Sequence, residues 1–308
     1  MDMFDQIVNF FPMIPHIGEW QEAQNMFRHA ASRKPDHWLM PVRACEAVGG
    51  SQEQAVPAVL AIACAHISIL LVDDMLDDDP RGEYRRIGMP ASSNMACAFQ
   101  AAALQALAQC VKEPSARLAA LTSFNEMFLS TAFGQFLDVQ SPADEAAYWR
   151  TTQTKSSPFF GAALQAGALA GGGSLDAAER LKELGCLYGE MIQVHDDMHD
   201  TMETPANPDW SQGRSPLPIL FAQLVDHPDR ARFMELHKNI SDEGALQEAQ
   251  EILIRCGAVS YCVDQLIRRH EKAQGILNAI SLVRRDAIAS LLDEVIAPVQ
   301  RLLESCEA

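Results

Sequence analysis

The stretch that most limits the fold of this chain runs from Ala55 to Val72. Its 18 residues are interrupted only by Pro57, His66 and Ser68, and they lead directly into the acidic run DDMLDDD. A bilayer-crossing segment would not tolerate such a run at its boundary without strong cause. We therefore predict a helix buried in the core of the protein rather than a transmembrane segment.

The rest of the sequence also carries helical patterns. Apolar residues recur at spacings of three and four, Ala, Leu, Glu, Gln and Met dominate, and alternating Val, Ile and Thr runs are missing from the sequence. The breaks are short and rich in Gly or Pro, and none has the composition of a long linker. We predict an all-α fold in one domain, residues 1–308, with helices near 18–30, 38–48, 52–78, 91–111, 114–140, 144–171, 175–203, 215–225, 229–238, 244–255, 258–278 and 283–305.

Composition and charge narrow the function classes. The chain has 308 residues, of which 48% are apolar, so it can bury a large core. With 24 Lys and Arg against 41 Asp and Glu, the formal net charge is −17, whereas a duplex-binding protein needs a net cationic footprint. We therefore expect no nucleic-acid partner. Anions can bind only through local cations or bridging metal ions.

The cysteines and the N-terminus indicate the compartment. None of the eight cysteines forms a CxxC pair, and most lie inside apolar helical patterns, which favours free buried thiols in a reducing compartment. The opening residues MDMFDQIVNFFPMIP lack a basic region and a small-residue cleavage site. We expect a soluble, cytoplasmic protein with no transmembrane segment.

One acidic pentapeptide occurs twice. DDMLD at residues 73–77 recurs as DDMHD at residues 196–200, each at the C-terminal end of a long apolar helix. A single acidic run is more often a solvated helix end, but two such copies favour metal binding. On a helix, the first and fifth positions share a face, and Mg²⁺ prefers oxygen ligands that it shares with substrate phosphates. The predicted metal ligands are Asp73, Asp74, Asp77, Asp196, Asp197 and Asp200.

Further segments accompany the two motifs. They are His66 seven residues before the first motif, Arg85-Arg86-Ile87-Gly88-Met89-Pro90 after it, Gly134-Gln135-x-x-Asp138, Lys155-Ser156, Gln193 before the second motif, and Gly213-Arg214-Ser215-Pro216-Leu217-Pro218. In these segments the chain resembles the trans-isoprenyl diphosphate synthases, the polyprenyl synthetase family, over roughly residues 30 to 275. The resemblance implies a large helical bundle of the isoprenoid synthase type around a central cavity, and a homodimer.

The resemblance also implies a reaction. Mg²⁺, three ions per site when substrate is bound, would hold an allylic diphosphate between the two motifs. Ionisation gives an allylic cation, the double bond of isopentenyl diphosphate attacks it, and the departing diphosphate or a neighbouring oxygen removes a proton. The implied catalytic residues are Asp73, Asp74, Lys155, Gln193 and Asp196. The implied substrate-binding residues are Lys34, His37, His66, Arg85, Arg86, Lys155, Ser156, Gln193 and Arg214.

Simpler interpretations exist for several of these residues taken singly. A lone lysine such as Lys155 is more often a surface charge, and His66 in an apolar helix is more often a hydrogen-bonded core histidine. Gln193 could only satisfy a buried polar network. His195 and His199 flank the second motif, but histidine is a poor ligand for Mg²⁺, so we leave both outside the predicted site.

The chain departs from the family pattern near its N-terminus. The family shows Gly-Lys-Arg-x-Arg-Pro, whereas residues 33–38 read RKPDHW, which keeps Lys34 but places His37 where an arginine is usual. Neutral histidine cannot reproduce the two-pronged contact of arginine with phosphate. A terpene cyclase-like enzyme that ionises a single preformed prenyl diphosphate is therefore an alternative. A catalytically poor partner subunit is a third hypothesis, which two whole aspartate motifs argue against.

Product length depends on the floor of the apolar tunnel. In the family an aromatic residue four or five positions before the first aspartate closes it early. Here those positions hold Ile69 and Ser68, so we expect a product of C20 or longer rather than C15. Phe99, Phe128 or Phe133 could still close the tunnel, although core packing is the more common role of a phenylalanine.

Overall fold

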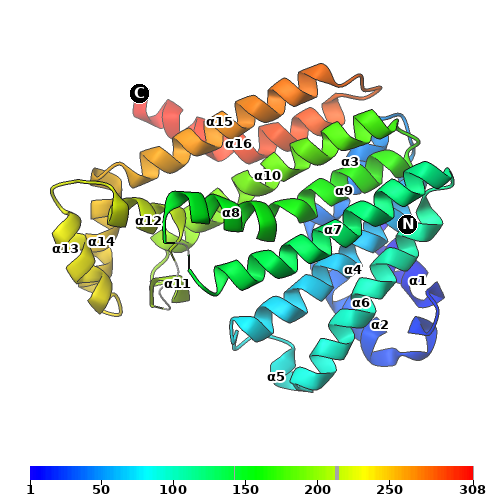
Figure 1. Ribbon diagram of the computed structural model, residues 1–308, viewed down its shortest axis with the longest axis horizontal. Coiled ribbons are helices and arrows are strands. Elements are labelled where there is room, and N and C mark those ends of the chain that lie inside the picture. Colours follow the sequence, from blue (N-terminus) through cyan, green and yellow to red (C-terminus); the bar gives the residue numbers. More distant parts are fainter. Residues whose placement is uncertain (142, 212–214, 308) are drawn as a thin grey trace. The chain divides into compact units, whose positions relative to one another are not determined.

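The computed structural model describes residues 1–141, 143–211 and 215–307, and in these ranges every regular element is a helix (Figure 1). The predicted all-α fold is therefore confirmed. The α-helices are α1 (Met3–Phe10), α2 (Gln21–Ser32), α3 (Met40–Ala47), α4 (Gln52–Leu76), α5 (Tyr84–Ile87), α6 (Met89–Cys110), α7 (Pro114–Asp138), α8 (Glu145–Lys155), α9 (Ser157–Ala170), α10 (Leu175–Met202), α11 (Pro208–Ser211), α12 (Leu217–Leu224), α13 (Arg230–Leu236), α14 (Glu243–Arg255), α15 (Ala258–Ala279) and α16 (Asp286–Glu307).

One predicted helix is wrong in its extent. The span 144–171 forms two helices, α8 and α9, which meet at Ser156. Pro158 explains the break, because proline has no N–H to donate to the carbonyl of Thr154 and its ring clashes with that carbonyl. Helices α1, α5 and α11 are further differences, since no helix was predicted over their residues.

Contacts divide the chain into two compact units. The first comprises residues 1–131, 158–186 and 276–290, and the second comprises residues 132–157, 187–275 and 291–308. Each unit is described by itself below. The single domain expected from the sequence stays a prediction.

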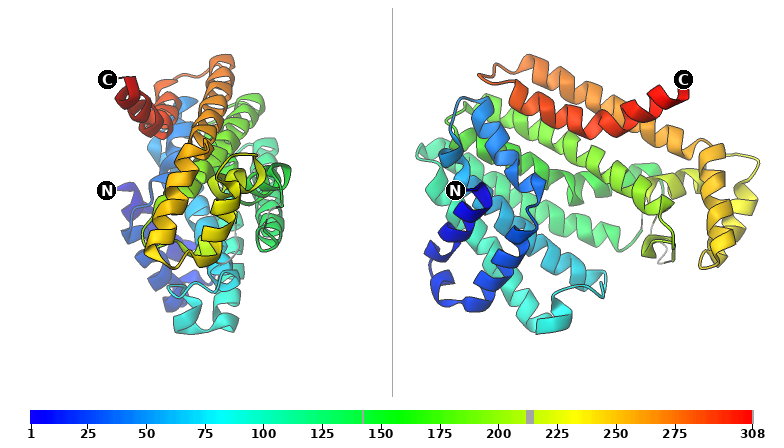
Figure 2. Two further views of the ribbon diagram at one scale, coloured as in Figure 1. Left: turned by 90° about the vertical axis from the view of Figure 1, so that its left-hand side faces the viewer. Right: turned by 180° about the vertical axis from the view of Figure 1, so that it is seen from behind.

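Helix α4 forms the core of the first unit. Ser51 and Gln54 make a capping box that starts it, in which the Ser51 N–H donates to Gln54 Oε1 at 2.8 Å. The helix is apolar on all sides and packs most extensively against α6, which lies beside it in both views (Figures 1 and 2). Small alanines allow this close approach, and Ser68 Oγ donates to the Ala96 carbonyl of α6 at 2.9 Å.

The apolar character of α4 is that of a buried helix. Among the described residues, α4 alone is long and apolar enough to cross a membrane by length and composition. However, 72% of its most apolar window is buried inside the protein, as in a core helix. Burial within the first unit therefore accounts for the long apolar stretch.

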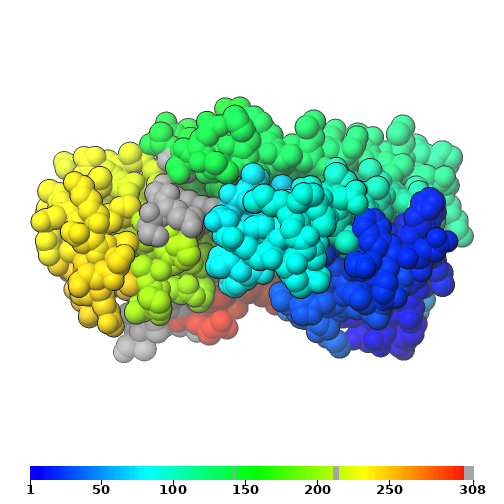
Figure 3. Space-filling view, turned by 90° about the horizontal axis from the view of Figure 1, so that it is seen from below, coloured from blue at the N-terminus to red at the C-terminus, as the bar shows by residue number. Residues whose placement is uncertain are grey.

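The N-terminal segment adds an aromatic cluster to the first unit. Phe11 stacks on Phe27 at 4.2 Å between ring centroids and on Phe99 at 5.5 Å. Phe99 is therefore a core residue that packs under the N-terminal helices. Figure 3 shows the N-terminal segment (blue) on the same face as the segment that includes α5 (cyan).

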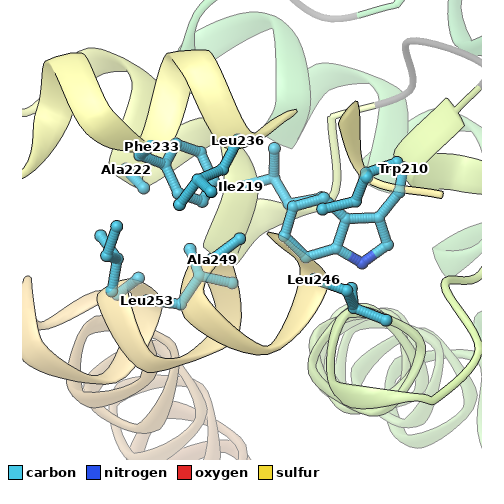
Figure 4. Packing of buried hydrophobic residues seen from close by; sticks show 11 residues of the cluster. Trp210, Ile219, Ala222, Phe233, Leu236, Leu246, Ala249 and Leu253 are labelled. Atoms are coloured by element: carbon cyan, nitrogen blue, oxygen red, sulfur yellow. The ribbon is translucent and has the colours of Figure 1, made fainter. Parts of the chain in front are cut away.

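A hydrophobic cluster stabilises the second unit (Figure 4). Trp210 is 1% exposed and lies among apolar side chains of α12, α13 and α14, including Ile219, Phe233 and Leu246. Its indole Nε1–H donates to the carbonyl of Thr201 at 3.2 Å. The cluster thereby supports the C-terminal end of α10, which carries the second aspartate motif.

A buried ion pair fixes the positions of α8, α10 and α15 within the second unit. Arg269 Nε of α15 donates to Glu190 Oε2 of α10 at 2.7 Å, and both side chains are nearly buried. The guanidinium also lies 3.5 Å above the Trp149 ring of α8. Gln153 Nε2 donates to the other oxygen of Glu190 at 3.2 Å. These contacts set which residues of α8 face which residues of α10.

Candidate active site

The first aspartate motif lies at the C-terminal end of α4, in the first unit. Asp73 and Asp74 belong to the last turn, and Asp77 caps the helix through its N–H, which donates to the Asp73 carbonyl at 2.9 Å. The helix dipole is negative at this end, so carboxylates here are unfavourable. Burial, followed by the charges of Asp79 and Asp73, raises the pKa of Asp74. This end of α4 therefore favours a cation.

A tight loop follows the motif and folds back onto it. A Cβ atom at Gly82 would lie 2.8 Å from Cβ of Asp74 and 2.7 Å from the Tyr84 ring, so this position needs glycine. The Tyr84 hydroxyl donates to Asp78 Oδ1 at 2.9 Å. Arg85 lies over the Tyr84 ring at 4.8 Å. The loop thus brings cations and carboxylates together beside the motif.

The predicted substrate-binding cations of the first unit have acidic partners there. The three pairs are Arg85 with Asp78 (2.7 Å), Arg86 with Glu83 (2.7 Å) and Lys34 with Asp2 (2.6 Å). These cations are largely exposed, and exposed ion pairs contribute little to stability. An incoming diphosphate could therefore replace the carboxylates at little cost.

The two histidines of the predicted site lie together in an aromatic cluster. His37 and His66 meet edge to face at 4.5 Å between ring centroids, and Phe159 lies 5.8 Å and 5.6 Å from them. Trp38 Nε1–H donates to His66 Nδ1 at 3.1 Å, so the ring proton of neutral His66 is on Nε2. Burial lowers the pKa of His37 to about 4 and that of His66 to about 3. Their contact with a diphosphate stays a prediction. As neutral rings, the two histidines could only donate a ring N–H hydrogen bond to it.

The second aspartate motif lies on α10, in the second unit. Gln193, Asp196, Asp197 and Asp200 follow the spacing that places residues on one face of a helix. Burial and the neighbouring Asp200 raise the pKa of Asp196 to about 6, and burial also raises the pKa of Asp200. A cation between these two carboxylates would relieve their repulsion.

Asp197 differs from its neighbours because it is buried and hydrogen-bonded. Its Oδ2 accepts from the Tyr148 hydroxyl at 2.7 Å and from the Leu217 N–H at 2.8 Å. Its Oδ1 accepts from Gln193 Nε2 at 2.9 Å. The Gln193 Oε1 atom in turn accepts from Ser156 Oγ at 2.7 Å. Burial nevertheless raises the pKa of Asp197 to about 7.

Lys155 ends α8 in the second unit. Its Nζ lies 2.5 Å from Asp138 Oδ2, and both side chains are 22% exposed. Gly134 makes this contact possible, because a Cβ there would lie 2.3 Å from the Lys155 backbone nitrogen. The Gly134, Asp138 and Lys155 positions that the sequence singled out are therefore one local structure.

These groups of the second unit surround a small polar cavity of about 90 Å³. Most of its lining is polar, so the cavity suits a compact polar group rather than a prenyl chain. The lining residues are Asp138, Tyr148, Thr151, Thr152, Lys155, Ser156, Gln193, Asp197, Asp209, Ser215 and Pro216.

The carboxylates of the two aspartate motifs form open sets of oxygen ligands. Within the described ranges, no three His, Cys, Asp or Glu side chains converge as a closed metal site. Each motif instead offers several carboxylates. Burial raises the pKa of Asp74 in the first motif and of Asp196 and Asp197 in the second. Such open oxygen sets fit Mg²⁺, which keeps waters and shares phosphate oxygens with its substrate. The six metal ligands stay predictions. The oxygens of Asp197 already accept three hydrogen bonds.

Some contacts of the predicted site residues within each unit were not predicted from the sequence. Trp38 and Tyr148 were not singled out, although Tyr148 is seven residues before Lys155 and so on the same face of α8. Arg214 lies outside the described residues. His195, left outside the site, bonds to the Val295 carbonyl at 2.8 Å.

Comparisons with known proteins agree with this arrangement. The polyprenyl synthetase family model matches residues 34–253. A short chain isoprenyl diphosphate synthase of Methanothermobacter thermautotrophicus is 29% identical over 280 residues, which cover 82% of each chain. A geranylgeranyl diphosphate synthase of Methanosarcina mazei is 32% identical over 172 residues, which cover 52% of each chain.

Solved structures show the same fold. The crystal structure of geranylgeranyl pyrophosphate synthetase from Pyrococcus horikoshii has a TM-score of 0.82 at 20% identity, and the match covers 96% of this chain and 94% of that one. The bundle is thus of the isoprenoid synthase type. With a family model that matches most of its length, the chain belongs to the polyprenyl synthetase family and is a prenyltransferase.

Proposed function

We propose that the protein condenses an allylic diphosphate with isopentenyl diphosphate in a Mg²⁺-dependent reaction and releases a longer linear trans-polyprenyl diphosphate. The observation that carries the proposal is the polar cavity of the second unit, where Lys155, Ser156 and Gln193 lie beside the second aspartate motif. The relatives named above are synthases of such products, which supports the same reaction class here.

The residues suggest how the reaction proceeds. When bound at the motif carboxylates, Mg²⁺ would neutralise the diphosphate and stabilise the charge that develops as it leaves. Lys155 would donate to diphosphate oxygens in exchange for Asp138, and the Gln193 amide oxygen would face the allylic cation. Arg85 and Arg86 would exchange their exposed acidic partners for the second diphosphate. No nucleophilic side chain is needed, because positioning and electrostatics suffice.

Product analysis tests this proposal. Purified protein with Mg²⁺ would be incubated with C10, C15 or C20 allylic diphosphates, with and without isopentenyl diphosphate, and examined by mass spectrometry before and after phosphatase treatment. Longer linear diphosphates formed only with isopentenyl diphosphate support the proposal. Absence of turnover with every substrate contradicts it and favours the partner-subunit hypothesis.

A second candidate function is a terpene cyclase-like reaction of one prenyl diphosphate. The aromatic cluster around His37 and His66 favours it, because neutral rings replace the cationic group that would grip a second diphosphate. Aromatic faces also suit a carbocation. Hydrocarbons or alcohols formed from a single allylic substrate would establish this alternative.

We propose a product of C20 or longer. Ser68 points at the α6 backbone, Ile69 is not aromatic, and Phe99 is used in the N-terminal cluster. Phe128 is buried edge to face against Phe124, as in ordinary core packing. Phe133 is 40% exposed.

We also propose that the protein acts in the cytoplasm as a homodimer, without a transmembrane segment. Helix α7 carries large exposed apolar side chains, with Leu118 at 66%, Leu129 at 75% and Phe136 at 60% exposure, which a second copy could cover. Sedimentation equilibrium of the wild type and of Leu129→Glu would test this. The wild type is expected as a dimer, and a monomeric wild type would contradict the proposal.

A further inference from the structure

The carboxylate of Asp197 is the centre of a hydrogen-bond network within the second unit. The residue is 7% exposed, and its two oxygens accept from three donors that come from three places in the chain. Those donors are the Tyr148 hydroxyl of α8, Gln193 Nε2 of α10 and the Leu217 N–H at the start of α12.

A metal-binding role would conflict with this network. Coordination would compete with Tyr148, Gln193 and Leu217 for the lone pairs of Asp197, and a donor that lost its bond would be left buried without an acceptor. Asp196 is exposed and Asp200 is half-buried, and among the described residues of the second unit neither carboxylate accepts such a set of hydrogen bonds. The motif thus contains two kinds of aspartate.

The network also determines the orientation of Gln193. An ionised carboxylate only accepts hydrogen bonds, so Gln193 must turn its amide NH₂ toward Asp197. Its Oε1 atom then faces the opposite way, where it accepts from Ser156 Oγ at 2.7 Å. Gln193, Ser156 and Lys155 all line the polar cavity. Asp197 lines the same cavity, and its contact with the amide NH₂ fixes the Gln193 amide oxygen toward Ser156.

We propose that Asp197 is a positioning residue that orients the Gln193 amide oxygen toward the reacting group, and that Tyr148 and the Leu217 N–H hold Asp197 in place. Asp196 and Asp200 are then the carboxylates of this motif that bind metal. The proposal rests on the proposed function, because a cationic intermediate is what the amide oxygen would stabilise.

The neutral variant Asp197→Asn can fold, because the network can reverse. If the asparagine offers its NH₂ to Gln193, the glutamine amide flips, its Oε1 accepts from residue 197, and its NH₂ turns to Ser156. The hydroxyl of Ser156 can accept that bond. The fold is kept, but the amide NH₂ of Gln193, the positive end of its dipole, then faces Ser156.

Two measurements separate positioning from metal binding. Calorimetric titration with Mg²⁺ and inorganic diphosphate measures binding without turnover, and steady-state kinetics with a C15 allylic diphosphate and isopentenyl diphosphate measures kcat and KM. For Asp197→Asn and Tyr148→Phe we expect diphosphate binding within about threefold of the wild type, an unchanged KM, and a kcat reduced about 10- to 100-fold. Asp196→Asn should lose at least about tenfold in binding.

The controls keep the test sharp. Tyr261→Phe removes another tyrosine hydroxyl of the second unit, one that bonds to the exposed Glu145, and should leave kcat unchanged. A Gln193→Ala, Asp197→Asn double variant should be no slower than Gln193→Ala alone, since Asp197 acts through Gln193. Thermal melting of every variant checks that each is folded.

Some results would overturn the inference. Diphosphate binding by Asp197→Asn that is as weak as that of Asp196→Asn would exclude the positioning role. A full wild-type kcat in both Asp197→Asn and Tyr148→Phe would also exclude it. Failure of the proposed function gives a different pattern, in which the wild type turns over no allylic diphosphate with isopentenyl diphosphate while the calorimetric ranking of the variants can still be measured.

Discussion

The two aspartate motifs end similar long helices, but their surroundings differ. In the first unit, Arg85 and Arg86 are exposed and paired with Asp78 and Glu83, and His37 is neutral. In the second unit, Asp197 and Lys155 have short contacts with partners that are fixed by α7, α8, α10 and α12. The charged groups of the second unit are therefore held by buried or half-buried contacts, whereas the cations of the first unit are exposed.

The largest expected effect is that of removing a metal-binding carboxylate. Asp196→Asn should lower kcat about 10²- to 10³-fold, because the charge that develops on the diphosphate loses its stabilisation. The matched control is Asp176→Asn on the same helix, whose side chain is 82% exposed. Steady-state kinetics across a Mg²⁺ titration measures both. Equal rates for the two variants would contradict a metal site at the second motif.

The next effect compares two lysines that each contact a carboxylate. Lys155 is 22% exposed, whereas Lys34 is 63% exposed. Lys155→Met should reduce kcat/KM for the allylic diphosphate about 10- to 100-fold, as expected for a hydrogen bond to a charged group worth about 1.5–3 kcal/mol. Lys34→Met should change KM for isopentenyl diphosphate by less than about threefold.

The opposite ranking would break the comparison between the units. If Lys34→Met raised KM for isopentenyl diphosphate tenfold or more, the first unit would hold a fixed cationic site after all.

The buried histidines His37 and His66 should make the stability of the protein fall as the pH is lowered. Folding lowers the pKa of His37 to about 4 and of His66 to about 3 from an ordinary 6.5, so between pH 6.5 and these values the unfolded chain binds more protons. Stability therefore rises with pH across that window and is lost as pH falls. The double variant His37→Gln, His66→Gln should lose less stability between pH 7 and pH 5 than the wild type, by of order 4 kcal/mol, about 2 for each histidine.

Urea unfolding at pH 7 and pH 5 measures this difference. His29→Gln is the control, because its ring is exposed and lies outside the cluster. An identical pH dependence for the double variant and the wild type would show that the cluster does not titrate as described.

The smallest expected effect is on product length. Ile69→Phe places an aromatic residue four positions before Asp73 and should shorten the main product by about one isoprene unit while changing kcat only a fewfold. Ile254→Phe, at a 60% exposed position of α14, serves as the control. Mass spectrometry of phosphatase-treated products reads the result, and an unchanged length distribution would place the floor elsewhere.

Much of the fold could be predicted from the sequence because helix periodicity and breaker residues are local signals. The buried α4 helix and both aspartate motifs were predicted correctly as helical elements. The break at Ser156 was missed because the apolar pattern continues across it, and only Pro158 marks it.

The contacts between site residues within each unit could not be predicted in the same way. Asp197 meets Tyr148, 49 residues earlier, and Leu217, 20 residues later, and no local pattern encodes that meeting. The contact between His37 and His66 likewise joins two elements 29 residues apart. The motifs in the sequence indicated which charged residues belong to the candidate site. The packing of the helices determines which of those residues already have a partner of opposite charge or a hydrogen-bond donor.

The most direct test of the account is the fate of labelled isopentenyl diphosphate. Purified wild-type protein would be incubated with Mg²⁺, a C15 allylic diphosphate and the labelled substrate, and the phosphatase-released alcohols would be separated by length. The account predicts label in linear alcohols of C20 or longer, and none without Mg²⁺. Consumption of the allylic diphosphate into unlabelled hydrocarbons or alcohols would contradict it.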